Sequence, residues 1–114
     1  MQSLSILLGS SEWPAESFGD IPEPNTEAAI IKVDTIDGGA TVEYQGMKES
    51  ELAAYVDVVK SLGYTEKADE TRSQSYYSYT ALRNSEGHIL DMVIISYEIS
   101  DGGIATTRIG CVRG

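Results

Sequence analysis

Hydrophobic and polar residues alternate with a period of two from residue 29 onward. Ala29–Ile36 is apolar and β-branched, and within Ala40–Gln45 the side chains of Val42 and Tyr44 point to one face. Between the two segments, Asp37-Gly38-Gly39 supplies residues that tolerate the backbone conformations of a tight turn. The pattern therefore predicts a β-hairpin whose second strand is half buried.

The period then changes to that of a helix over Glu49–Leu62. Apolar residues recur there at spacings of three and four and form one stripe, which comprises Leu52, Tyr55, Val56, Val59 and Leu62. Gly63 follows at the position where helices often end in a left-handed residue, and Tyr64 is placed to fold back on the stripe. We expect an amphipathic helix that packs on the sheet.

Four further segments read as strands. Thr65–Arg72 is polar and weakly strand-like, as edge strands often are. Ser75–Arg83 is rich in tyrosine, which favours strands. His88–Ile99 contains Met92–Ile95, apolar on both faces, which predicts a central strand. Ile104–Val112 returns as the last strand.

The order of these elements predicts an α+β fold. An antiparallel sheet of five or six strands carries one helix on a face, in the order β-β-α-β-β-β-β. Residues 29–114 form this single domain, and residues 1–28 form an extended, proline-containing lead-in without regular structure. One helix cannot cover six strands, so Trp13 and Phe18 of the lead-in are expected to cover part of the second face of the sheet.

The net charge of the chain limits the kinds of molecule that it can bind. The 114 residues contain 18 acidic and 8 basic side chains, a formal net charge of −10. Nucleic acids and anionic membranes repel such a surface, whereas a basic protein partner is attracted. No apolar run approaches the length of a membrane-spanning helix, and the sequence as written has neither the basic start of an export signal nor an anchor.

Candidate chemistry is sparse. One cysteine and one histidine exclude an internal disulfide and make a zinc site implausible. A turn centred on Asp101-Gly102 would place Cys111 opposite Met92 and about 13 Å along the strand from His88, too far for a catalytic pair. We expect Cys111 to be a small buried hydrophobe, and we predict no catalytic residue, metal ligand or cofactor.

A cluster of tyrosines is the most suggestive feature. In the predicted fourth strand, alternation places Tyr77 and Tyr79 on one face and Tyr76 on the other. One set belongs to the core, and the other is exposed beside Arg72 and Arg83. Exposed tyrosine and arginine are typical of protein contact surfaces, so these five residues form a candidate binding surface. Simple packing within the sheet is the alternative.

Short motifs add a resemblance. Trp13-Pro14 and Ile21-Pro22-Glu23-Pro24 precede the hairpin, and Tyr55-Val56 and Leu62-Gly63-Tyr64 belong to the helix and its end. With these motifs the chain resembles a family of small uncharacterised domains found mainly in secreted lipoproteins of Gram-positive bacteria. The resemblance implies an extracytoplasmic domain. It brings no activity, cofactor or catalytic residue with it.

Two functions follow as expectations. The first is a non-catalytic domain of the bacterial cell envelope that contacts a protein or a small ligand. The alternative is a cytoplasmic, acidic, immunity-type inhibitor that masks a basic toxin. The location is extracytoplasmic if a leader was removed and cytoplasmic otherwise.

Overall fold

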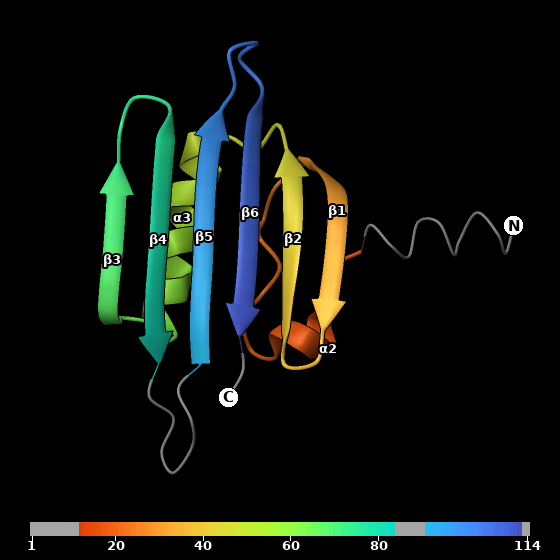
Figure 1. Cartoon of the computed structure of the whole chain (residues 1–114), viewed down its shortest axis with the longest axis vertical. Helices are drawn as coiled ribbons and strands as arrows, with labels where there is room; N and C mark the ends of the chain where they lie inside the picture. Colours follow the sequence, from red (N-terminus) through yellow and green to blue (C-terminus); the bar gives the residue numbers. More distant parts are fainter. Residues whose placement is uncertain (1–11, 84–90, 113–114) are drawn as a thin grey trace, which may run out of the picture.

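The computed structural model describes residues 12–83 and 91–112. Six strands form one antiparallel sheet in the spatial order β1-β2-β6-β5-β4-β3 (Figure 1). They are β1 (Ala29–Ile36), β2 (Gly39–Gln45), β3 (Glu66–Arg72), β4 (Tyr76–Arg83), β5 (Asp91–Ile99) and β6 (Ala105–Val112). A short helix, α2 (Ala15–Phe18), precedes the sheet, and the main helix α3 (Glu49–Ser61) follows β2. This confirms the predicted α+β fold and its element order.

Helix α3 forms where the apolar stripe predicted it. The Glu51 carboxylate accepts a hydrogen bond from the backbone N–H of Lys48 at 3.0 Å, which satisfies a free donor at the start of the helix. Gly63 has a φ of +103° just past the helix end, and Tyr64 is completely buried. Both features match the prediction. Among the described residues, no helix is long and apolar enough to cross a membrane.

One face of the sheet is buried. Alternate residues of four strands point into the core, and α3 lies against this face behind β4 and β5 (Figure 1). The buried side chains from the sheet are Ala40, Val42, Tyr44, Tyr77, Tyr79, Ala81, Asp91, Val93, Ile95, Tyr97, Thr107, Ile109 and Cys111. The period-two pattern thus identifies the core-facing positions of each strand.

The lead-in docks on the sheet, as expected, but it covers the same face as α3, so the expectation that it covers the second face is wrong. Phe18 is completely buried and Ile21 is 1% exposed. Trp13 stacks on Phe18 with ring centroids 4.0 Å apart. The Cys111 thiol lies 3.4 Å from the carbonyl oxygen of Ser17. The lead-in fills the part of the buried face that α3 is too narrow to reach.

Regular structure in the lead-in was not predicted, yet α2 is a single helical turn within it. Pro14 stands just before the turn, and Gly19 follows it with a φ of +65°. Proline at a helix start and glycine after its end are the signals for such a turn. Residues 1–11 of the lead-in lie outside the described residues.

The hairpin between β5 and β6 differs from the prediction by one residue. Cys111 faces Val93, and Met92 faces Val112. The loop has three residues instead of two: the N–H of Ser100 donates to the carbonyl of Ile104, and Gly103 has a φ of +80°. Cys111 is nevertheless buried, as expected. His88 lies outside the described residues.

Strand β5 is interior, as predicted, but its second face is not covered by any described segment. Val93 and Ile95 are fully buried beneath α3 and the lead-in, whereas Ile94 is 39% exposed. Met92 on the same outer face is half-buried. Apolar residues on both faces of a strand therefore indicate a central position here without indicating a second covering layer.

Buried tyrosines dominate the polar chemistry of the core. Burial raises the pKa of five phenols above the ordinary value, those of Tyr44, Tyr55, Tyr77, Tyr79 and Tyr97. The native state therefore holds these protons more tightly than the unfolded chain does.

Stability is expected to fall at alkaline pH. In the unfolded chain the tyrosines ionise near pH 10, while the folded protein keeps the five phenols neutral to higher pH. The stabilisation is complete below that pH and is lost as the pH rises through and above it. Denaturant titrations on both sides of about pH 10 would measure the fall. Gradual phenolate absorbance in a chain that stays folded would contradict it.

The lead-in is expected to contribute substantially to stability. Replacing the buried phenyl group in Phe18→Ala should lower the free energy of unfolding by about 3–5 kcal/mol. Ile36→Ala serves as the control because Ile36 is 72% exposed, and it should change stability by about 0.5 kcal/mol or less. Equal melting temperatures for the two variants would show that the lead-in is only a tether.

Candidate functional site

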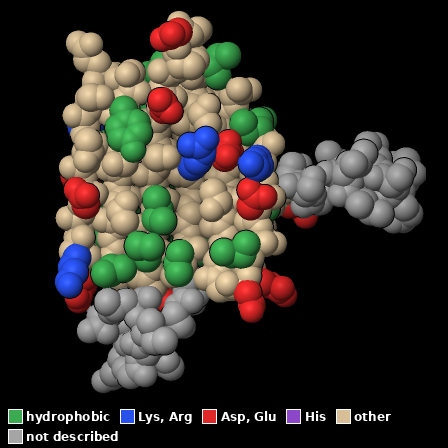
Figure 2. Space-filling view, viewed as in Figure 1, with side chains coloured by type: hydrophobic (Ala, Val, Ile, Leu, Met, Phe, Trp, Pro, Cys, Tyr) green, Lys and Arg blue, Asp and Glu red, His purple; other side chains and the backbone are tan. Residues whose placement is uncertain are grey.

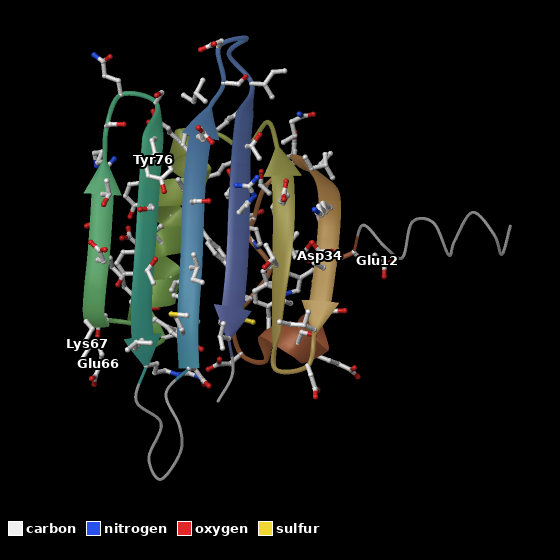
Figure 3. All side chains as sticks on the ribbon, viewed as in Figure 1. Glu12, Asp34, Glu66, Lys67 and Tyr76 are labelled. Atoms are coloured by element: carbon white, nitrogen blue, oxygen red, sulfur yellow. The ribbon has the colours of Figure 1, made fainter. Side chains whose placement is uncertain are left out.

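The three clustered tyrosines of β4 divide between the two faces of the sheet, as alternation predicted. Tyr77 and Tyr79 are 7% and 2% exposed on the face beneath α3. Tyr76 is 39% exposed on the opposite side, which Figure 3 shows in front of the strand with α3 behind it. Arg72 and Arg83 accompany the buried pair, because Arg72 is the cross-strand partner of Tyr77 and Arg83 continues the same alternation along β4. The five residues do not share one surface.

Tyr79 has a structural role. Its hydroxyl donates a hydrogen bond of 2.7 Å to the carbonyl oxygen of Tyr64. The ammonium group of Lys60 lies 5.2 Å from the centre of its ring. These contacts tie the end of α3 to the middle of the sheet, and they leave Tyr79 no free polar atom for a partner.

Arg83 also joins parts of the fold. Its guanidinium lies 2.6 Å from the Asp20 carboxylate of the lead-in and 3.1 Å from Asp91 at the start of β5. It also stacks over the Tyr64 ring at 4.4 Å. The hydrogen bond to Asp20 is the main cause of a raised Arg83 pKa. Arg83 therefore holds the lead-in, the helix end and the sheet together.

Tyr77 and Arg72 instead line a groove at the edge of the molecule. Strand β3 extends beyond α3, and a groove of about 390 Å³ remains between the helix and strands β3 and β4. The Arg72 guanidinium lies 4.7 Å above the Tyr77 ring, and its side chain is 70% exposed. The Tyr77 hydroxyl donates a 2.6 Å hydrogen bond to Glu70. We call this site the α3–β3 groove.

Tyr97 completes the floor of the groove, and sequence reasoning did not single it out. It is the cross-strand partner of Tyr77 on β5 and is 5% exposed. It lines the groove, and its hydroxyl has no hydrogen-bond partner among the described residues. Alternation with Val93 and Ile95 places Tyr97 on the buried face, but only the pairing of β4 with β5 brings it beside Tyr77.

Charged side chains of both signs form the rim of the groove. Helix α3 contributes Glu49, Asp57 and Lys60, and β3 contributes Glu70 and Arg72. Burial, followed by the hydrogen bond to Glu70, raises the Tyr77 pKa, whereas burial and nearby Glu49 raise that of Tyr97. Both phenols therefore stay neutral near pH 7 and can donate hydrogen bonds. The groove combines an aromatic floor, hydrogen-bond donors and a polar rim, the chemistry of a recognition site.

A larger groove, of about 950 Å³, lies between the lead-in and the first turns of α3. Three of its polar side chains form hydrogen bonds that join the lead-in to α3 or cap the helix. The Tyr55 hydroxyl donates to the carbonyl of Pro22 at 2.8 Å, and Glu51 accepts from both Thr26 and the backbone of Lys48. These bonds, the backbone bond first, lower the Glu51 pKa. This groove serves chiefly as the seam that attaches the lead-in.

Metal-binding side chains were sought among the residues that the structure describes. They contain no group of three or more His, Cys, Asp or Glu side chains placed to hold a metal ion. Cys111 is buried against the lead-in. The α3–β3 groove thus remains the candidate functional site, with Tyr77, Tyr97 and Arg72 as its principal residues.

Comparison of the chain with protein-family models, curated proteins and solved structures found no match. The candidate site therefore stands on its own geometry: an aromatic floor between a helix and an overhanging edge strand.

Proposed function

We propose that this chain is a non-catalytic binding domain of the bacterial cell envelope, and that the α3–β3 groove receives an extended segment of a partner protein. The observation that carries the proposal is Tyr97. Its ring is almost completely buried in the floor of an open groove, while its hydroxyl lacks a partner among the described residues. A donor held in this way is available for a ligand.

The adjacent edge strand supports an extended ligand. Strand β3 is the last strand of the sheet and all seven of its residues are exposed. Its second half, from Asp69 to Arg72, pairs regularly with β4. Near its start, Lys67 has a φ of +50° and the pairing is irregular, at the lower end of β3 in Figure 3. An edge of this kind can accept a further strand over its regular half while the bulge blocks the rest.

Charge supports a basic partner. The five rim side chains sum to −1, and the chain as a whole carries −10. A segment with lysine or arginine would be attracted over long range and would find carboxylates at the rim, of which Glu49 and Asp57 lie on α3. Arg72, with its exposed guanidinium, is placed to bind an acidic group or carbonyl of the same segment.

The resemblance to domains of secreted lipoproteins supports the cell-envelope assignment. The acidic charge also favours the alternative, a cytoplasmic immunity-type inhibitor of a basic toxin. Both functions use the same chemistry, recognition of a basic partner by an acidic domain. They differ in the compartment and identity of that partner.

Selection of phage-displayed random peptides on the intact chain tests the groove. We expect basic peptides whose binding shifts the amide resonances of Asp69–Arg72 and of the first turns of α3. Removing the Tyr97 hydroxyl in Tyr97→Phe should weaken binding about threefold to tenfold. Arg72→Ala should weaken it about tenfold or more.

Tyr76→Ala is the matched control, because Tyr76 neighbours Tyr77 in sequence but lies on the opposite face. It should leave peptide affinity unchanged. Peptides that shift resonances elsewhere, or that lose affinity equally in the control variant, would refute the proposed site. Failure of every library to yield a binder would refute it as well.

A further inference from the structure

The backbone groups at the free edge of β3 belong to Glu70 and Arg72. The N–H of Ser73 donates a 2.8 Å hydrogen bond to the carbonyl of Tyr76, so Ser73 turns its backbone groups toward β4. In an antiparallel pair such residues alternate with residues whose N–H and C=O point away from the partner strand. The register is regular over this half of β3, so Thr71 also faces β4. Glu70 and Arg72 therefore turn their N–H and C=O outward, where a further strand can bind them.

The side chains of the same two residues lie on the groove side of the sheet. Arg72 is the cross-strand partner of Tyr77, and Glu70 is the partner of Tyr79. Both tyrosines are buried on the face beneath α3, and cross-strand partners share a face. Glu70 and Arg72 also line the α3–β3 groove. Each therefore offers an added strand two backbone hydrogen bonds and one charged side chain.

Tyr77 holds the two charges in place. Its ring lies 4.7 Å from the Arg72 guanidinium, and its hydroxyl donates a 2.6 Å hydrogen bond to Oε2 of Glu70. The Arg72 guanidinium lies 4.0 Å from the same oxygen, and the two side chains are 70% and 41% exposed. Both charges are thus accessible to a ligand. Side chains that are already held lose less freedom on binding.

We propose that β3 reads the order of charges in its partner and selects a segment in which an acidic residue stands two positions before a basic one. This inference rests on the proposed function and names the sequence that the α3–β3 groove receives. An antiparallel strand runs against β3, so its residue opposite Arg72 comes two positions before its residue opposite Glu70. Opposite charges in such pairs stabilise the sheet, whereas like charges destabilise it.

The short regular edge favours an antiparallel strand over a parallel one. In antiparallel pairing, Glu70 and Arg72 each exchange both hydrogen bonds with the single residue opposite. A parallel strand needs a longer stretch for the same bonds, because they slant to residues on either side, and its pairing is slightly less stable per residue. The irregular pairing around Lys67, whose φ is +50°, restricts the length that β3 can offer.

Titration of the full chain with two short synthetic peptides, followed by amide resonances, tests the proposal. Both peptides have capped ends and the same symmetric host sequence of threonine and valine. They differ only in the order of one aspartate and one lysine, which stand two positions apart. We expect the aspartate-first peptide to bind about fivefold tighter or more, with the largest shifts at Glu70 and Arg72. Added salt should reduce this preference.

Exchanging the two charges of β3 in the double variant Glu70→Arg, Arg72→Glu should reverse the preference. The matched control is Glu43→Arg, Arg108→Glu, which conserves the net charge in the same way. Glu43 and Arg108 form a 3.1 Å ion pair between β2 and β6 on the opposite face of the sheet. Figure 2 shows this face, on which acidic and basic side chains lie side by side. The control should keep the natural preference, and melting curves verify that both variants fold.

The outcomes separate this inference from the proposed function. Equal affinities for the two peptides, with resonance shifts in the groove, would overturn the charge order and leave the groove as a peptide site. A tighter lysine-first peptide on the natural chain would overturn it as well, and so would a preference that survives the exchange at Glu70 and Arg72. If neither peptide shifts the resonances of β3, the proposed function fails, and the charge order fails with it.

Discussion

The width of the buried sheet face, set against the width of a single helix, is the constraint on which the rest of the structure depends. Six strands span about 29 Å, whereas an α-helix with its side chains is about 10 Å across. Helix α3 lies over β4 and β5, so it leaves β6 and β2 on one side and β3 on the other. The chain resolves these two gaps differently. The lead-in fills the first, and the second becomes the α3–β3 groove.

An extended segment in the first gap leaves backbone polar groups that must find hydrogen-bond partners. A segment without strand partners buries carbonyl groups that need donors. Tyr55 supplies a hydroxyl to Pro22, and the Cys111 thiol lies against the carbonyl of Ser17. At the end of β4, the Arg83 guanidinium binds a carboxylate from the lead-in and another from β5. Polar side chains of α3 and of the sheet thus supply partners to an irregular segment that has no strand neighbours of its own.

The second gap gives the molecule its candidate site. Because α3 does not reach β3, the aromatic pair Tyr77 and Tyr97 is covered from above only in part, and Arg72 stacks at its border. The other side of the sheet has no covering segment among the described residues, and Ile94 of β5 is 39% exposed there.

The periodicity of the sequence was sufficient to predict helix α3, the six strands and the residues that each of them points into the core. The stripe from Leu52 to Val59, the alternation of Tyr77 and Tyr79, and the helix-ending Gly63 are local patterns, which follow from backbone geometry alone. The burial of Cys111 was also predicted correctly, whereas its predicted cross-strand partner was wrong by one residue. A local pattern was available for α2 as well, in Pro14 and Gly19.

Tertiary structure decided what covers each face and which residues meet. Alternation shows that Tyr76 and Tyr77 point to opposite faces of the sheet. It does not indicate which of the two faces the lead-in covers. A loop of Asp101, Gly102 and Gly103 permits a two-residue or a three-residue turn, and the choice shifts every pair of β5 and β6 by one. Arg83 reaches Asp20 across 63 positions of sequence, and Tyr97 meets Tyr77 only through sheet register. These contacts depend on packing between distant segments, which no local pattern encodes.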